Sequence, residues 1–369
     1  MAFTDGTRDP RSIPSCQRAV KALQSSTTTY IVTHWDADGV ASAALLLRNL
    51  SPRRAYTRIG FPRIGSYSAD AVPLENVGGE SLVVLLDYGI PAEELDRLAS
   101  LLPHNTKLVV IDHHATSPPQ NKEIIYCNPV GLGKAGEQEY PSASLLVYML
   151  SGAPSDTRDR SLALLGVAGD LAPYVESGKS HPGIEWALRA TGLSSNDLKR
   201  LHSLSVRVDS CYRLLDYDCL WLSILAGVSL GANGIERLEE VDRASARAGE
   251  LVRQALSQLK LVFEREGVRV YSLVFDGYVT SYVGRWLAKS SHGNMVSVLV
   301  HYIPGEGRGF IYARSLSGGL SRVIRVLRRR SLRVGGKDAV LVVEYSGVEF
   351  PVDLVEEVVE AILSEWKKK

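Results

Sequence analysis

Cysteine is scarce in this chain of 369 residues, and the four cysteines form no C-x-x-C pair. Cys16 and Cys127 stand far apart in the sequence, and only Cys211 and Cys219 lie close together. This pattern excludes a zinc ribbon and indicates no disulfide framework. We therefore expect the protein to work in a reducing cellular interior.

An excess of charge of either sign is also missing, because 42 Lys and Arg residues face 41 Asp and Glu residues. Affinity for a polyanion must then come from local clusters of charge, which argues against a structural nucleic-acid coat. Long apolar runs are absent too, so we expect no signal peptide, no membrane partner and a soluble, cytoplasmic protein. With 45% hydrophobic residues the chain can bury the cores of roughly two domains.

Short apolar runs alternate with helical patterns in the first half of the chain. We predict strands at 30–33, 82–86 and 108–111, each followed by a helix, at 39–50, 91–102 and 141–150. This alternation predicts an α/β fold with a parallel sheet covered by helices on both faces. Ligands of such folds collect beyond the carboxyl ends of the strands, so the residues that follow each run are the candidate site.

The rest of the chain divides into a helical linker and a second alternating region. The predicted boundaries are an N-terminal extension at 1–29, the parallel-sheet domain at 30–190, a linker at 191–266 and a smaller α/β domain at 267–369. Within the linker, the segment 235–266 contains many charged residues and no proline, which indicates one long connecting helix. The last domain is expected to hold strands at 268–275, 295–300, 309–313 and 339–344, with helices at 279–290, 319–327 and 352–366.

The segment after the first predicted strand carries His34, Asp36, Asp38 and Gly39. Alternate side chains of an extended segment face one way, so the histidine and both aspartates can converge, while Gly39 permits a sharp turn into the helix. Imidazole with carboxylates is a ligand set that suits manganese, iron or zinc. Taken alone, the segment is equally well read as a helix cap.

Three later segments add carboxylates and imidazoles at corresponding places. Asp87 follows the second strand and would, alone, most often be a turn cap. Asp112, His113 and His114 end the third strand, where three titratable groups would be poorly solvated unless they bound a metal or each other. Asp170 ends an apolar helical pattern. Together these segments supply the ligands that two octahedral ions require.

The four segments together resemble the DHH phosphoesterase family, in its RecJ-like branch and especially the archaeal RecJ-type single-strand nucleases. Asn128-Pro129, the glycines that follow and the segment at 141–144 resemble that branch as well. The resemblance implies two divalent cations, with manganese preferred over magnesium. It places His34 and Asp36 on one ion, Asp38, His113 and Asp170 on the other, and Asp87 between them. It further implies that Asp112 orients His113 and that His114 contacts the scissile phosphate.

The second α/β region resembles the DHH-associated substrate domain. Arg314-Ser315 matches the family's Arg-Ser pair, whereas Val334-Gly335-Gly336-Lys337 keeps two glycines and has lysine where the family has histidine. Lys337 offers a point charge but lacks the acid-base behaviour of imidazole. The resemblance implies substrate contacts at Arg314, Ser315, Gly335, Gly336 and Lys337, and the surrounding basic residues favour a contact at Arg333 as well. The lysine leaves substrate length and end preference open.

Nine basic residues and no acidic residue lie between positions 308 and 337. They are Arg308, Arg314, Arg322, Arg325, Arg328, Arg329, Arg330, Arg333 and Lys337. A groove-facing cluster would follow a phosphate backbone. A solvated helix face is an equal alternative for 322–330, because Leu320, Val323, Ile324 and Leu327 form an apolar stripe there.

Two aromatic residues, Trp35 and Tyr88, lie beside the metal motifs in the sequence. Their rings would either stack on a terminal base or, more commonly, only pack in the core.

The function expected from these features is a two-metal exonuclease that releases nucleotides from single-stranded DNA or RNA. A nanoRNase or phosphatase for very short oligonucleotides or 3′-phosphoadenosine-like nucleotides is the enzymatic alternative. A RecJ-like scaffold of replication or repair is an alternative of another class, although such scaffolds lose metal ligands that this chain retains. A helicase or another replication or DNA repair protein is the protein partner that the resemblance implies. Digestion polarity and the choice between DNA and RNA stay open.

Overall fold

The computed structural model describes residues 9–50, 56–75, 77–79, 81–291, 295–330 and 332–366. Its described residues group into two compact units. The N-terminal unit comprises the chain up to Tyr212 together with Asp216–Ser245, and the C-terminal unit comprises Arg213–Leu215 and the chain from Ala246 onward. In the described part of the chain, no helix combines the length and the apolar character needed to span a bilayer.

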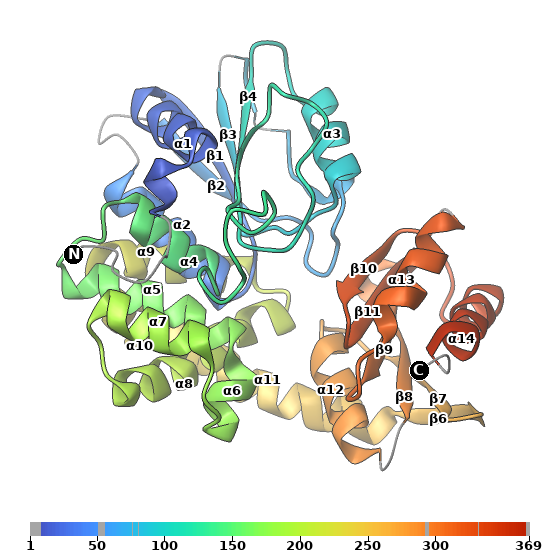
Figure 1. Ribbon diagram of the computed structural model, residues 1–369. Helices are drawn as coiled ribbons and strands as arrows, with labels where there is room; N and C mark the ends of the chain where they lie inside the picture. Colours follow the sequence, from blue (N-terminus) through green and yellow to red (C-terminus); the bar gives the residue numbers. More distant parts are fainter. Residues whose placement is uncertain are drawn as a thin grey trace. The chain divides into compact units, whose positions relative to one another are not determined.

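A five-stranded, wholly parallel sheet forms the centre of the N-terminal unit, in the order β2-β1-β3-β4-β5 (Figure 1). The strands are β1 (Thr28–Thr33), β2 (Tyr56–Gly60), β3 (Leu82–Leu86), β4 (Lys107–Ile111) and β5 (Ile125–Cys127). The central strand β3 is buried along its whole length, as expected where helices cover both faces of a sheet. The predicted α/β fold with a parallel sheet is confirmed, although the edge strands β2 and β5 were not predicted.

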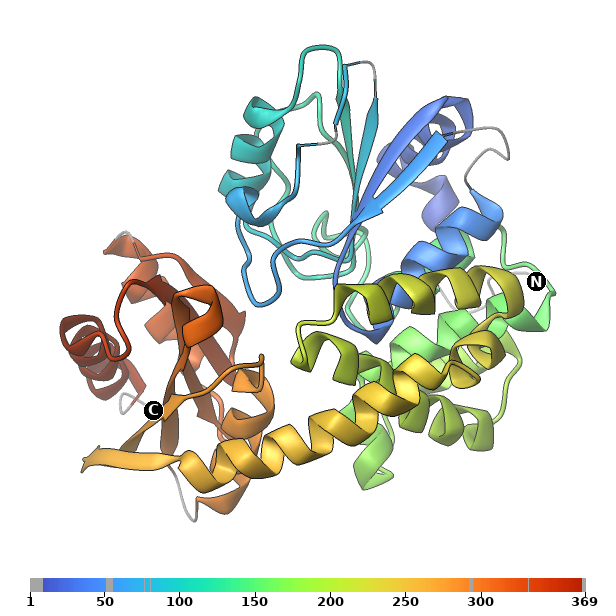
Figure 2. The same ribbon diagram turned by 180° about the vertical axis from the view of Figure 1, so that it is seen from behind.

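The N-terminal unit contains many helices, the last of which continues into the C-terminal unit. They are α1 (Pro14–Ser25), α2 (Ala37–Asn49), α3 (Ala92–Leu101), α4 (Ala143–Leu150), α5 (Thr157–Asp170), α6 (Ala172–Ser177), α7 (Pro182–Thr191), α8 (Ser195–Arg213), α9 (Tyr217–Leu230), α10 (Ala232–Glu236) and α11 (Glu239–Gln258). Helix α3 lies on the side of the sheet opposite α1 (Figures 1 and 2). Helices α4, α5 and α9 pack against α2, so α2 is buried among helices as well as against the sheet.

The segment between the two sheets differs from the prediction at both ends. One helix was expected over 235–266, but α10 ends at Glu236, α11 begins at Glu239 and ends at Gln258, and strand β6 (Lys260–Arg265) follows. Most residues of β6 are exposed, and the strand pairs only with β7 at the edge of the second sheet. Because both of its faces lack a regular apolar alternation, a pattern of hydrophobicity could not reveal it.

A mixed six-stranded sheet forms the C-terminal unit, in the order β10-β11-β9-β8-β7-β6. Its other strands are β7 (Val268–Val274), β8 (Val296–Ile303), β9 (Arg308–Ser315), β10 (Val334–Lys337) and β11 (Val340–Ser346). Helices α13 (Leu320–Arg329) and α14 (Val352–Trp366) pack on one face, and α12 (Thr280–Ser290) packs on the other with the end of α11. Successive side chains of β9 alternate between these two cores, as the period of a strand requires.

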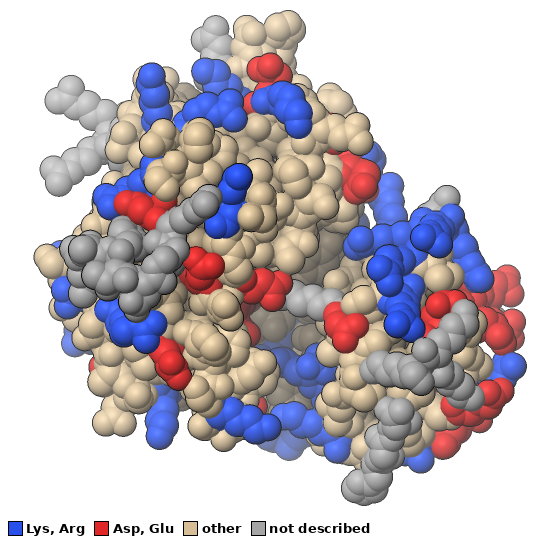
Figure 3. All heavy atoms as spheres, in the orientation of Figure 1, with Lys and Arg blue, Asp and Glu red and all other residues tan. Residues whose placement is uncertain are grey.

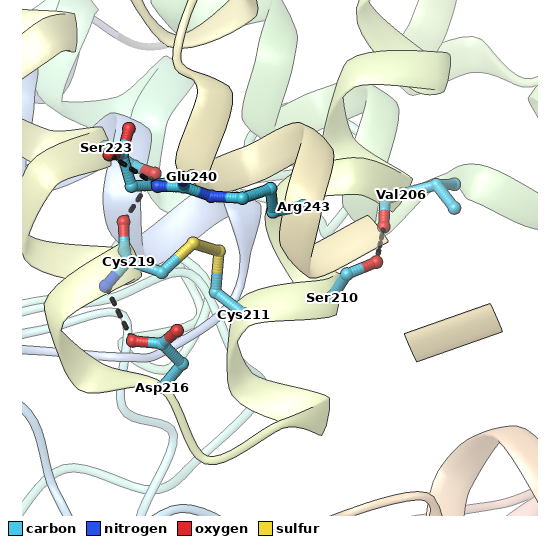
Figure 4. The surroundings of a disulfide bond; sticks show 8 residues. All are labelled: Val206, Ser210, Cys211, Asp216, Cys219, Ser223, Glu240 and Arg243. Atoms are coloured by element: carbon cyan, nitrogen blue, oxygen red, sulfur yellow. Dashed lines mark hydrogen bonds and ion pairs between the residues drawn. A yellow bond between two sulfur atoms is a disulfide. The ribbon is translucent and has the colours of Figure 1, made fainter. Parts of the chain in front are cut away.

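The cysteines are paired, contrary to the expectation from their spacing. Cys16 of α1 is joined to Cys127 of β5 across 111 positions, and Cys211 near the end of α8 is joined to Cys219 at the start of α9 (Figure 4). Spacing could not show the first pair, because only the packing of α1 against β5 brings its two residues together. The cysteines therefore give no support to a reducing interior, and the cytoplasmic location stays a prediction.

Candidate metal centre

The carboxyl ends of the central strands bring the predicted ligands to one edge of the sheet. Each residue that leaves a strand donates its backbone N–H to the neighbouring strand: His34 to Leu86 O at 3.0 Å, and Asp87 to Ile111 O at 3.0 Å. Asp112 continues the series, donating to Cys127 O at 3.2 Å. The parallel register thus places three motifs side by side although the sequence separates them widely.

The first motif turns directly into α2. Asp36 is the N-cap of the helix, and its side chain accepts a hydrogen bond from Gly39 N–H. Asp38 points instead toward the start of α4, where its two oxygens accept hydrogen bonds from Ala143 N–H at 2.6 Å and Ser144 N–H at 2.9 Å. Asp36 therefore caps the helix, and this role is compatible with the predicted role of the segment as a source of metal ligands.

Close approach of α5 completes the pocket. A Cβ atom at Gly166 would overlap Asp38 Oδ1 and Ser144 Oγ, so only glycine lets α5 come this near. One turn further, Asp170 at the end of α5 reaches His113, with Asp170 Oδ2 lying 3.2 Å from His113 Nε2. The fourth predicted motif thus joins the other three.

Among the described residues, three groups of side chains could hold a metal ion, and the ligand atoms within each group lie within 4.8 Å of one another. One group combines Asp87 and His113 with Asp112 and His114, and the other two together contain all six predicted ligands. Of these two, the first is His34, Asp36 and Asp87, and the second is Asp38, His113 and Asp170. Asp87 Oδ2 lies 4.0 Å from His34 Nδ1, while Asp87 Oδ1 lies 3.5 Å from His113 Nε2. Asp87 therefore faces both groups. The geometry agrees with the implied assignment of ligands, and the metal roles themselves stay a prediction.

Four atoms of this cluster are buried and have no hydrogen-bond partner among the described residues. They are His34 Nδ1, Asp87 Oδ1, His113 Nε2 and Asp170 Oδ2. Their neighbours are charged groups at ion-pair distance, such as Asp36 Oδ2 at 2.9 Å from His34 Nδ1 and Asp170 Oδ2 at 3.2 Å from His113 Nε2. A buried polar atom without a well-aligned hydrogen bond is costly, and each of these atoms belongs to a residue able to bind a metal. The donor set of carboxylate oxygens and imidazole nitrogens thus fits divalent cations such as Mn²⁺.

Burial and mutual repulsion also make this pocket unfavourable for ionised carboxylates. Burial, together with the charge of Asp170, raises the pKa of Asp38 to about 7. Burial and the charges of Asp38 and Asp36 raise the pKa of Asp87 well above its ordinary value. Burial opposes protonation of His113, but the carboxylates of Asp170 and Asp87, at 3.2 and 3.5 Å from its Nε2, outweigh it and raise its pKa well above the ordinary value. The raised pKa values of these carboxyl groups reflect the repulsion between buried negative charges, which divalent cations would relieve.

Asp112 has a different partner from the one that was implied. Its Oδ1 accepts hydrogen bonds from the backbone N–H of His113 and of His114 and lies 2.7 Å from His114 Nδ1. The ring of His113 is instead placed by Tyr140, whose carbonyl lies 3.3 Å from His113 Nδ1. Asp112 therefore orients His114, and the expectation that it orients the ring of His113 was wrong. Burial acts upward on the pKa of Asp112, but the charge and hydrogen bond of His114 lower it to about 2.

Two aromatic residues near the motifs are packing residues. Trp35 is 2% exposed and Tyr88 is 1% exposed, so neither ring has a free face for a base. Sequence reasoning missed Tyr67, whose hydroxyl lies 3.2 Å from His34 Nε2 and whose ring stacks on Tyr88. Nothing in the segment around Tyr67 marks it, because the link to His34 depends on how the chain folds back after β2.

The predicted substrate contacts of the C-terminal unit lie at the ends of β9 and β10. Arg314 is partly exposed and donates to Tyr312 Oη at 2.9 Å, whereas Ser315 is fully buried, with its Oγ 3.0 Å from Ser317 Oγ. A direct contact through the Ser315 side chain does not fit this burial. Gly335 has open space around its Cβ position, and Gly336 needs glycine because its φ is +131°. The side chain of Lys337 lies outside what the structure describes, and Arg333 is exposed.

The basic segment divides between the interior and the surface. Arg308 is 3% exposed and pairs with Glu306 and Glu344, so it is structural. The arginines of α13 are exposed opposite its buried apolar stripe, and Figure 3 shows Lys and Arg side chains gathered over this helix. One face of α13 therefore packs and the other presents positive charge to solvent, and contact with a phosphate backbone stays a prediction.

Comparison with known proteins identifies the class that this fold and cluster define. Residues 28–169 match the model of the DHH family, N-terminal domain, so this part of the chain is a DHH-family domain. Members of this family are metal-dependent phosphoesterases. A search of curated proteins found no match.

Over almost its full length the chain has the fold of RecJ-type proteins. The exonuclease RecJ bound to manganese matches with a TM-score of 0.62 and 20% identity, covering 98% of this chain and 96% of that one. RecJ from Thermus thermophilus in complex with Mn²⁺ matches with a TM-score of 0.60 and 19% identity, covering 98% of this chain and 56% of that one. A DHH-domain member of the s1p family of ribosomal proteins gives 0.64 and 15%, with coverages of 98% and 94%. At these identities the likeness establishes the fold.

Proposed function

We propose that this protein is a two-metal phosphodiesterase that releases nucleotides from an end of single-stranded DNA or RNA, with Mn²⁺ as its preferred cation. The observation that carries the proposal is the pair of ligand groups that Asp87 faces, His34 and Asp36 on one side and Asp38, His113 and Asp170 on the other. Retention of all six ligands argues against a scaffold without activity.

Each group of side chains in the pocket has its own role in the proposed reaction. Two divalent ions, when bound by these six residues, supply charge neutralisation of the phosphate and an acidified water. His114 is the residue left to act on the leaving group, since it is not one of the six and its side chain is 27% exposed. Asp112, whose Oδ1 lies 2.7 Å from Nδ1, orients the ring, and in its protonated form the ring would donate from Nε2–H to a phosphate oxygen or to the leaving oxygen. No nucleophilic side chain is required.

The exposed arginines of α13 support a polymeric substrate over a dinucleotide. A strand of several phosphates can contact several guanidinium groups, whereas a dinucleotide needs only the groups beside the metal centre. A helicase or a replication or repair protein remains the proposed protein partner, and a cytoplasmic location remains proposed with it.

The direct test uses oligonucleotides labelled at either end, of DNA and of RNA, incubated with the purified protein and Mn²⁺. We expect labelled mononucleotides to be released from one end only, and no release in EDTA. His113→Ala should lose this activity, whereas Ser203→Ala, at an exposed position of α8, should keep it. Fastest turnover on two-nucleotide substrates would favour the nanoRNase alternative, and no hydrolysis of any phosphodiester would contradict the proposal.

A further inference from the structure

Helix α8 lies in the segment that the sequence assigns to a linker, yet one of its faces contacts the backbone of two metal motifs. The face consists of His202, Ser205 and Asp209, which recur at the three- and four-residue spacing of a helix side. It packs in the N-terminal unit, to which residues up to Tyr212 belong.

Asp209 contacts the first motif. Its Oδ1 accepts a hydrogen bond of 3.0 Å from the backbone N–H of Ala37, the residue between Asp36 and Asp38. Ala37 is the first residue of α2, and its N–H has no partner within that helix. A carboxylate from a neighbouring helix therefore completes the cap that Asp36 begins, and its charge suits the positive end of α2.

His202 and Ser205 contact the fourth motif. His202 Nδ1 lies 3.2 Å from Ala168 O, two residues before Asp170. The Cβ position of Gly169 lies 3.6 Å from Ser205 Cβ and 3.5 Å from Ala37 Cβ, so α8, α5 and the start of α2 meet at this glycine. Ser205 is 1% exposed, and a larger side chain there would push α5 and α2 apart.

We propose that this face of α8 is a positioning surface for the metal centre, with Asp209 as its principal residue. Holding Ala37 fixes the backbone between Asp36 and Asp38, while holding Ala168 and Gly169 fixes the end of α5 that carries Asp170. One rigid helix thus sets the separation between the two ligand groups. Residues that orient metal ligands from behind commonly change metal affinity when they are removed. The inference rests on the proposed metal centre but not on the nature of the substrate.

The test measures Mn²⁺ binding by the full chain without nucleic acid, using the electron paramagnetic resonance signal of free Mn²⁺. Asp209→Ala should weaken binding by about 10- to 100-fold, the usual effect of losing such a partner. Asp209→Asn keeps an oxygen that accepts from Ala37 N–H and should restore most of the affinity. Asp218→Asn, at an exposed position in the first turn of α9, is the matched control and should bind as the wild type does.

A second readout needs no metal. Hydrogen exchange at the Ala37 amide should accelerate in metal-free Asp209→Ala and stay slow in Asp209→Asn, while the melting temperature reports whether each variant folds. His202→Ala, which removes the partner of Ala168 O, should also weaken Mn²⁺ binding, by less than Asp209→Ala does, and covers the case in which Asp209→Ala does not fold.

Wild-type affinity in a folded Asp209→Ala would overturn the inference, as would an Asp209→Asn as impaired as the alanine variant. These outcomes differ from a failure of the proposed function. A wild type that binds Mn²⁺ but hydrolyses no oligonucleotide would reject the proposed substrate and leave the positioning role testable.

Discussion

The candidate metal cluster of the N-terminal unit and the arginine cluster of the C-terminal unit differ in burial. In the N-terminal unit, Asp38, Asp87, Asp112 and His113 are all at most 7% exposed and share one pocket. In the C-terminal unit, the arginines of α13 are exposed and turn away from the buried apolar stripe. Buried charges interact strongly and demand compensation, whereas exposed charges are screened by water and salt. Under the proposed function, this difference assigns the chemistry to the first unit and a weak, salt-sensitive capture of an anion to the second.

The largest expected effect comes from removing the residue that faces both ligand groups. Asp87→Asn should reduce hydrolysis by more than about 100-fold, because even outer partners of metal ligands cost about 10- to 100-fold. Asp87 has a φ of +57°, which asparagine adopts readily, so the backbone should not change. The metal-free variant should also melt at a higher temperature, since a buried carboxylate with a raised pKa is gone. Steady-state rates with Mn²⁺ and calorimetry in EDTA check both effects.

The two units also differ in their disulfide bonds, because all four cysteines lie in the N-terminal unit. Cys16→Ser should lower the free energy of unfolding of that unit by about 2–5 kcal/mol, since the Cys16–Cys127 link closes a long loop of the unfolded chain. Hydrogen exchange, resolved by unit, measures this effect. Protection in the C-terminal unit should not change. Equal loss of protection in both units would show that their stabilities are coupled.

Acidification should act on the two units with opposite sign. In metal-free protein the pKa of Asp38 is about 7, above its ordinary value, so folding binds a proton and the N-terminal unit gains stability as pH falls from 7 toward 4. Burial lowers the pKa of His301 to about 4, so the C-terminal unit loses stability as pH falls below 6.5. At pH 5 the loss is on the order of 2 kcal/mol. Hydrogen exchange at pH 7 and pH 5 in EDTA measures both trends, and parallel responses of the two units would contradict this account.

The smallest expected effect concerns the exposed arginines. The double variant Arg325→Gln with Arg329→Gln should raise KM for a long single strand about tenfold at physiological salt and leave kcat unchanged. Its salt dependence should be shallower by about 1.4 in the slope of log K against log salt, from two lost phosphate contacts on a single strand. Arg265→Gln, which removes an exposed arginine of β6 paired with Glu360, is the control. An unchanged salt slope would make the α13 surface a solvated face only.

The sequence predicts the features whose residue pattern lies within one short segment, and it does not predict contacts between distant segments. The strands that end just before His34, Asp87 and Asp112 each contain a short apolar run, so the parallel sheet and the clustering of these residues at its edge followed directly. Strand β6 is exposed and carries no such pattern. The partners that complete the site, Asp209, Tyr67 and the Tyr140 carbonyl, meet it only through tertiary packing, and so do Cys16 and Cys127. The partner of Asp112 was misassigned because three adjacent residues do not reveal which ring each side chain meets.

The central claim is that two cations occupy the pocket at the carboxyl edge of the sheet. Anomalous diffraction from crystals grown with Mn²⁺ locates such ions directly. We expect two peaks per chain, one among His34, Asp36 and Asp87 and one among Asp87, Asp38, His113 and Asp170. A saturated crystal with no manganese in this pocket, or with ions bound only elsewhere, would contradict the account.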